Sequence, residues 1–146
     1  EKLCELNIET VQLVVTEWTQ QRPLKPNKWE RLQKIAVSAQ KQCGRAWPLK
    51  ILAPLELKKV IVPENDLKIV GSLAELAQPF VSLDSKYFSG MLHIFIGPEG
   101  GFSPAEESFF SKNKFIQVRW GETILRAETA AIVFATLAKM LPLLIS

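Results

Sequence analysis

The sequence predicts an α/β protein, and two stretches of the chain carry this prediction. Residues 94–129 alternate apolar runs of strand character with helical segments, in the order strand, glycine loop, helix, strand, second loop and final helix. Upstream, a valine-rich run from Thr10 to Thr16 is typical of a strand and precedes a helical pattern. The 146 residues suit one domain, and a hydrophobic content of 47% is enough for a core.

The first long helix is expected to run from Asn27 to Gly44. Asn27 is predicted to cap it, with Glu30 completing a pair that resembles a capping box. Gly44 favours the left-handed conformation that ends many helices. The apolar residues at helical spacing form one face: Trp29, Leu32, Ile35, Ala36, Ala39 and Cys43.

The middle of the chain gives weaker signals. Short strands are expected around Ile51 and from Leu67 to Val70. Residues 55–62 are ambiguous between helix and strand, and residues 73–77 are expected to form a short helical turn. Residues 78–90 are expected to be irregular.

The carboxyl-terminal half has clearer boundaries. Strands are predicted from His93 to Ile96 and from Phe115 to Val118, and the single histidine is expected to be a hydrogen-bonded core residue. Between these strands, Ser103 and Glu106 have the spacing of a capping box. A final helix rich in small residues follows, and Pro142 is expected to close it.

The first loop, Gly97-Pro98-Glu99-Gly100-Gly101, is a candidate ligand site because glycines let a ligand approach the backbone closely. Phe102-Ser103 follows it, so the Lys-Ser/Thr pair of a phosphate-binding P-loop is absent. The Glu99 carboxylate would repel a phosphate and better suits a neutral or cationic ligand. The alternative is a plain turn between strand and helix.

The second loop, Trp120 to Arg126, leads into an apolar helix. Arg126 and Glu128 stand beside a run that must be mostly buried. They are therefore either functional or joined in an ion pair or cap where the helix starts. Loops at the carboxyl ends of neighbouring strands are where open α/β sheets bind ligands.

The segments IGPEGGFS, WGETILRAETAA and KWERLQKIAVSAQKQCGR resemble the RsmE family of SPOUT-class methyltransferases, which methylate N3 of a uridine in small-subunit ribosomal RNA. The resemblance covers nearly the whole chain. It implies a parallel sheet flanked by helices, with a deep carboxyl-terminal trefoil knot. It also implies that S-adenosyl-L-methionine is the cofactor, that the protein is a cytoplasmic homodimer, and that ribosomal RNA of the small subunit is its partner.

The same resemblance implies that residues 1–146 are the SPOUT methyltransferase domain, without the family's amino-terminal RNA-binding β-barrel. Two positions depart from the family. Thr123 stands where the family often has Arg, which puts an anion contact there in doubt. Asn7 stands where Gly is usual, although Asn tolerates left-handed backbone geometry.

The resemblance also assigns roles to individual residues. Arg126 is expected to stabilise negative charge on the uracil, while Glu128 or Glu99 accepts the proton or holds Arg126. The family match suggests that Arg45 contacts RNA or shapes the active site; the alternative is that it bonds the last helix carbonyls. Arg22 is expected to contact RNA on different grounds, because the polar loop that holds it is a plausible RNA-facing edge; the alternative is a solvated loop. The expected cofactor-binding residues are Gly71, Ile96, Gly97, Gly100, Gly101, Trp120, Gly121, Ile124, Leu125 and Ala130.

Charge and cysteine content limit the classes of function that the sequence allows. A net charge of +3 permits RNA contact without requiring it. Cys4 and Cys43 form neither a disulfide framework nor a metal motif, and no metal is expected. No long apolar run predicts a membrane span. The rival hypotheses are a SPOUT enzyme with another RNA target, a non-catalytic dimeric RNA-binding module, and a nucleotide-phosphate binder.

Overall fold

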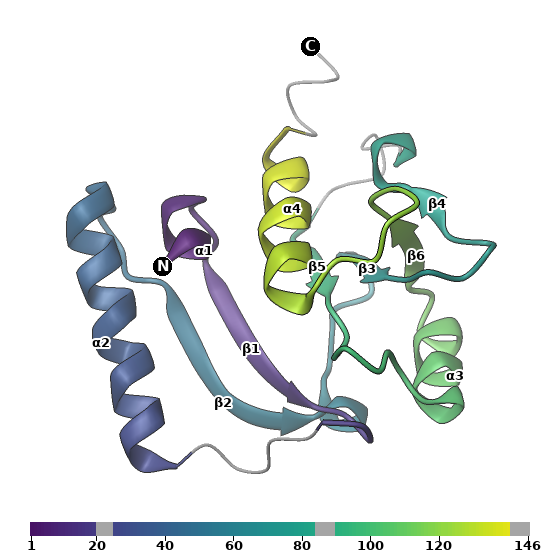
Figure 1. The fold of residues 1–146 in the computed structure, drawn as a ribbon, viewed down its shortest axis with the longest axis horizontal. Helices are drawn as coiled ribbons and strands as arrows, with labels where there is room; N and C mark the ends of the chain where they lie inside the picture. Colours follow the sequence, from purple (N-terminus) through teal and green to yellow (C-terminus); the bar gives the residue numbers. More distant parts are fainter. Residues whose placement is uncertain (20–24, 84–89, 141–146) are drawn as a thin grey trace.

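The structure is a computed structural model that describes residues 1–19, 25–83 and 90–140. All strand pairs in these ranges are parallel, so the expected parallel α/β class is confirmed. One sheet has two strands, and the other has four in the order β4-β6-β3-β5 (Figure 1). The strands are β1 (Thr10–Val15), β2 (Lys50–Glu56), β3 (Leu67–Gly71), β4 (Gln78–Pro79), β5 (Leu92–Phe95) and β6 (Ile116–Arg119).

Four α-helices and two short 3₁₀ turns complete the described part of the chain. Figure 1 shows α2 flanking the two-stranded sheet on the side away from the four-stranded sheet. The helices are α1 (Lys2–Glu5), α2 (Pro26–Cys43), α3 (Pro104–Lys112) and α4 (Ala127–Met140), and the 3₁₀ turns are η1 (Leu57–Lys59) and η2 (Phe80–Ser82).

The start of α2 differs from its prediction. The helix begins at Pro26, and no side chain caps it, so the expected Asn27–Glu30 capping pair is wrong. Proline suits the first helical position because its fixed φ is helical and its missing N–H would lack a partner there. The other end is as predicted, since Gly44 has the left-handed φ of 71°.

Arg45, which follows α2, links the end of that helix to α1 through hydrogen bonds. Its guanidinium Nη1 donates to the carbonyl oxygens of Cys4, at 3.2 Å, and Ile8, at 2.8 Å. These carbonyls belong to the end of α1 and the chain after it. The expected alternative, a bond to the last carbonyls of α2, is met by the Arg45 backbone amide, which donates to the Gln40 carbonyl at 3.2 Å. Asn7, between Cys4 and Ile8, has a φ of 56° and adopts the left-handed geometry expected for it.

Strand β3 is the centre of the four-stranded sheet and is buried on both faces. Ile69 is 0% exposed and packs with Phe134 of α4, whereas Val70 is 2% exposed and packs with Phe110 of α3. Adjacent residues of a strand point to opposite faces, so α4 and α3 cover the two sides of the sheet. A parallel sheet covered on both faces is the usual arrangement in α/β proteins.

Several local expectations are decided by the structure. Residues 73–77 form no helix but a turn in which the Ala77 amide donates to the Ala74 carbonyl at 2.9 Å. The ambiguous residues 55–62 comprise the end of β2, the turn η1 and three residues without regular structure. Within residues 78–90, expected to be irregular, the described part includes β4 and η2, and residues 84–89 lie outside the described ranges.

The remaining expectations concern single residues. His93 is half-buried, and its Nε2 lies 2.8 Å from Asp66 Oδ2, in agreement with the hydrogen-bonded role expected for it. Cys4 and Cys43 are both free thiols. Pro142, expected to end the last helix, lies outside the described residues, in which α4 extends to Met140.

Candidate functional site

A capping box fixes the carboxyl end of the first loop, as the sequence predicts. Ser103 Oγ accepts from the Glu106 amide at 3.4 Å, and Glu106 Oε2 accepts from the Ser103 amide at 2.9 Å. Glu106 Oε1 also accepts from the amide of Glu17 at 2.8 Å. One carboxylate therefore ties the start of α3 to the chain that follows β1.

Two glycines of the first loop are required by its geometry. Gly101 has a φ of 74°, and its amide donates to the Pro98 carbonyl at 2.8 Å to close a tight turn. A Cβ on Gly97 would stand 3.0 Å from Cε2 of Phe102, too close for ordinary contact. The loop thus folds back on itself, with the Phe102 ring packed close to Gly97 and open space beside Gly101.

The second loop delivers Arg126 to the start of α4. The Arg126 carbonyl accepts from the Ala130 amide at 2.8 Å, so the residue is fixed by the first turn of the helix. Its side chain is exposed, and within the described ranges it makes no hydrogen bond or ion pair. The alternative of an Arg126–Glu128 ion pair is therefore wrong, and the guanidinium is available for a ligand.

Both loops and the end of β3 surround a single cavity of about 430 Å³. Every residue expected to bind the cofactor lines it. These residues are Gly71, Ile96, Gly97, Gly100, Gly101, Trp120, Gly121, Ile124, Leu125 and Ala130. The loops meet because β5 and β6 both pair in parallel with β3, which brings their carboxyl ends to one edge of the sheet.

Of the residues predicted to be catalytic or to bind RNA, only some line the cavity. Arg126 and Glu99 line the cavity, whereas Glu128 is exposed in the first turn of α4 and is not part of the lining. Arg45 is away from the lining, bonded to the carbonyls described above. Arg22 lies outside the described residues.

Further polar side chains line the cavity that the sequence did not indicate. Arg119 and Gln117 come from β6, Ser72 follows β3, and Glu107 belongs to the first turn of α3. Ser72 Oγ lies 3.3 Å from Gln117 Oε1, across the pairing of β3 with β6. The pairing of β3 with β6 brings Ser72 and Gln117 together, and the sequence carries no local signal for it.

The cavity combines apolar walls with a few charges. The strand ends and helix α4 supply apolar side chains such as Ile96, Leu125 and Phe134. Glu99 and Glu107 supply negative charge, and Arg119 and Arg126 supply positive charge. Such a site can bury an apolar or aromatic group, bind polar atoms through loop backbone, and hold a cationic centre near a carboxylate.

A metal cluster and a membrane-spanning helix are both absent from the described residues. Residues 1–19, 25–83 and 90–140 contain no group of three or more His, Cys, Asp or Glu that could hold a metal ion. Over the same residues, every helix is too short or too polar to cross a membrane.

Fold and cavity together define a parallel α/β domain with a cavity where glycine-containing loops follow the sheet. The chain belongs to the RNA methyltransferase domain family, whose model it matches over residues 1–139. It is 31% identical over 133 residues to ribosomal RNA small subunit methyltransferase E of Aquifex aeolicus, a match that covers 88% of this chain and 55% of the relative. The resemblance to the RsmE family is therefore confirmed.

Solved structures of methyltransferases are also similar to this chain. A probable rRNA methyltransferase from Porphyromonas gingivalis matches with a TM-score of 0.85 and 28% identity, over 96% of this chain and 59% of that one. A ribosomal RNA small subunit methyltransferase E from Neisseria gonorrhoeae, bound to S-adenosyl methionine, matches with a TM-score of 0.80 and 28% identity, over 97% and 58%. The chain spans about half the length of the curated relatives it matches.

Proposed function

We propose that this chain is the catalytic domain of an S-adenosyl-L-methionine-dependent methyltransferase that acts on N3 of a uridine in small-subunit ribosomal RNA. The observation that carries the proposal is the convergence of both motif-bearing loops on one cavity, with the unpaired Arg126 guanidinium at its wall. The family and the relative solved with S-adenosyl methionine support the choice of cofactor.

The cavity suits this cofactor in volume and charge. A space of about 430 Å³ is in the usual range for small-molecule sites, and Ile96 and Leu125 offer apolar surface for an adenine ring. When bound, the cofactor supplies a methyl group activated by a positively charged sulfur. The carboxylates of Glu99 and Glu107 complement that charge, and they oppose binding of a free phosphate or a nucleoside polyphosphate.

Arg126 and Glu99 have the chemistry that methylation of an imide nitrogen needs. The N3 proton must leave, and Glu99 is a cavity carboxylate that can accept it. Loss of that proton places negative charge on the neighbouring carbonyl oxygens. The Arg126 guanidinium can stabilise this charge through its fixed fork of donors. Glu128 is outside the lining, and the proton-accepting role expected for it stays a prediction.

The proposal is tested by separating binding from chemistry. S-adenosyl-L-methionine is titrated into the parent and into Arg126→Ala by calorimetry, and N3-methyluridine formed in ribosomal RNA is quantified by nucleoside analysis. Both proteins should bind the cofactor with similar affinity. Loss of Arg126 should lower the methylation rate about 100- to 1000-fold, as removal of a charge-stabilising donor does in other enzymes.

Glu122→Gln is the matched control, because this exposed charged residue is nearby in sequence, is off the cavity lining and has no assigned role. It should retain both cofactor affinity and rate. A parent that binds no cofactor would overturn the proposed function. Arg126→Ala with a near-parental rate would remove that residue from the mechanism, and a different methylated nucleoside would assign another RNA target.

The assembly and topology expected from the family are also proposals. We propose a carboxyl-terminal trefoil knot, a homodimer and a cytoplasmic location for the 16.4 kDa chain. Helix α4 supports the dimer, because it buries Ala130, Phe134 and Ala135 while leaving Ile132 partly exposed. Light scattering should give twice the chain mass, and a monomer at micromolar concentration would refute the dimer.

A further inference from the structure

A closed turn follows β1 and carries an exposed tryptophan. The Thr19 amide donates to the Thr16 carbonyl at 3.2 Å, and the Thr16 amide donates to Thr19 Oγ1 at 2.9 Å. The two threonine hydroxyls are 2.7 Å apart, and Thr16 is buried. These bonds hold the backbone on both sides of Trp18, so its indole is presented by a fixed turn.

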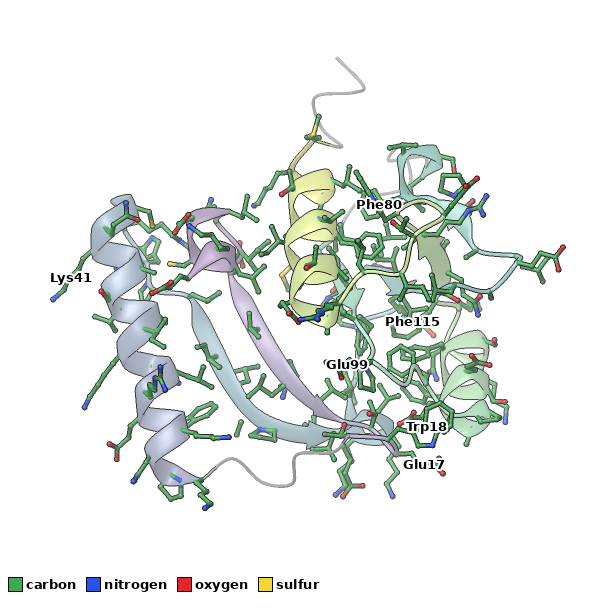
Figure 2. All side chains as sticks on the ribbon, in the orientation of Figure 1. Glu17, Trp18, Lys41, Phe80, Glu99 and Phe115 are labelled. Carbon is green, nitrogen blue, oxygen red and sulfur yellow. The ribbon has the colours of Figure 1, made fainter. Side chains whose placement is uncertain are left out.

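The turn is attached to the glycine loop of the cavity. The Glu17 amide donates to Glu106, the same carboxylate that caps α3. A Cβ on Gly100 would stand 3.6 Å from Cε3 of Trp18, an ordinary contact distance. Figure 2 shows Trp18 at the end of β1 beside α3, and Glu99 on the loop that leads to α3. The indole thus lies against a loop that forms part of the cavity wall.

Trp18 neither fills the core nor fills the cavity. It is 45% exposed and is not one of the cavity-lining residues. A tryptophan used only for packing would normally be more deeply buried, because its large apolar area is what stabilises a core. A half-exposed indole held beside a ligand cavity is instead the arrangement by which proteins stack single-stranded bases.

The charged side chains near the Trp18 indole favour binding of a base over binding of a phosphate group. Glu17 is in the turn, Glu99 is in the glycine loop, and Glu106 is in the first turn of α3, which is bonded to that turn. These carboxylates repel a phosphate group but do not oppose an uncharged base. Arg119, at the end of β6, and Arg126, on the second loop, offer positive charge at the same cavity.

We propose that the Trp18 indole is a base-stacking subsite for the RNA substrate, at the glycine-loop side of the cavity. The inference rests on the proposed function, since it names a surface that positions the substrate of that site. Trp18 is a positioning residue: it contacts a base and leaves cofactor binding to the cavity. Stacking on an aromatic side chain tolerates any base, so the subsite orients the RNA strand without reading its sequence.

The experiment measures RNA binding and cofactor binding separately. A fluorescein-labelled single-stranded oligouridylate is titrated with the parent, Trp18→Ala and Trp18→Phe by anisotropy, and S-adenosyl-L-methionine is titrated by calorimetry. Trp18→Ala should weaken RNA binding about 10- to 100-fold, the effect of losing one base–aromatic stack. Trp18→Phe should retain affinity within about threefold, and both variants should keep parental cofactor affinity.

Trp47→Ala is the matched control, because Trp47 is 79% exposed and lies between α2 and β2, away from the cavity lining. It should bind RNA like the parent. RNA should quench tryptophan fluorescence in the parent and in Trp47→Ala, and this quenching should be reduced in Trp18→Phe. A residue that only supports the loop would produce no such spectroscopic difference.

Parental RNA affinity in Trp18→Ala would overturn the inference. Equal loss of RNA and cofactor binding would also overturn it, since Trp18 would then only support the glycine loop. A parent that binds cofactor but no RNA refutes the subsite and leaves the cofactor site standing. A parent that binds RNA through Trp18 but no cofactor supports the subsite and refutes the proposed methyltransferase function.

Discussion

Replacement of Gly101 by alanine isolates backbone strain in the first loop. Gly101 has a φ of 74°, and an added Cβ would meet no atom within 4 Å, so no clash contributes. Left-handed geometry costs an L-residue about 1–2 kcal/mol. Alanine also restricts the unfolded chain, which offsets about 0.4–1 kcal/mol of that cost. We therefore expect Gly101→Ala to lower the free energy of unfolding by about 1 kcal/mol.

Two other glycines provide matched controls for this substitution. Gly44 has a φ of 71° and equally open surroundings, but it ends α2 and does not line the cavity. Gly121 lines the cavity and has open surroundings, but its φ is not positive. Gly44→Ala should therefore destabilise the protein as much as Gly101→Ala does. Gly121→Ala should change the free energy of unfolding by less than about 0.5 kcal/mol.

Urea unfolding measures these differences in the free energy of unfolding, provided that its dependence on urea concentration has the same slope in all variants. For a chain of this length, about 1 kcal/mol also lowers Tm by about 3 °C. S-adenosyl-L-methionine titration then separates the two strained sites, because only the Gly101 variant should bind the cofactor more weakly. The reasoning is refuted if Gly121→Ala is as destabilising as Gly101→Ala, or if Gly101→Ala is as stable as the parent.

Three further substitutions test core packing at Phe134, the hydrogen bonds of Arg45 to backbone carbonyls, and the pH dependence of stability at Asp66. Phe134→Ala removes a 4% exposed ring that packs on Phe80 and should cost about 3–5 kcal/mol in urea unfolding; a loss below about 1 kcal/mol would contradict this. Arg45→Ala removes the donor of both carbonyl bonds and should cost about 1–3 kcal/mol by the same assay, whereas parental stability would show that the bonds are dispensable. The hydrogen bond from His93 lowers the pKa of Asp66, so the unfolded chain takes up the proton first and stability falls as pH drops below about 4. Asp66→Asn should make stability less dependent on pH in that range, and an unchanged pH profile of unfolding would refute the assignment.

The signals that predicted structure correctly are local ones. The capping box of Ser103 and Glu106 and the left-handed Gly44 each depend on residues within four positions. Strands β1, β3 and β5 follow from short apolar runs and lie within one residue of their predicted ends. The capping pair at Asn27 failed although it is also local, because a proline one residue earlier already provides the helix start.

Some features could not be predicted from the sequence because they depend on pairing between segments that are distant in the chain. Strand β6 pairs with both β3 and the two-residue β4, and no periodicity identifies a strand as short as β4. Gln117 reaches the cavity only because β6 lies beside β3. The contact between Trp18 and Gly100 likewise joins two loops that no sequence pattern connects.

Motif resemblance identified the cavity residues, but the sheet register explains why they meet. Ile69 pairs with Ile94 in β5 and with Ile116 in β6, so the three strands end together and their loops open on one side. Glu106 then binds the chain after β1 to the same side through the Glu17 amide. The end of the two-stranded sheet is thereby held against the glycine loop, so a substitution there is expected to act on the proposed RNA subsite without changing the cavity lining. This coupling of the two sheets at one loop is the physical reason for placing the proposed subsite at Trp18.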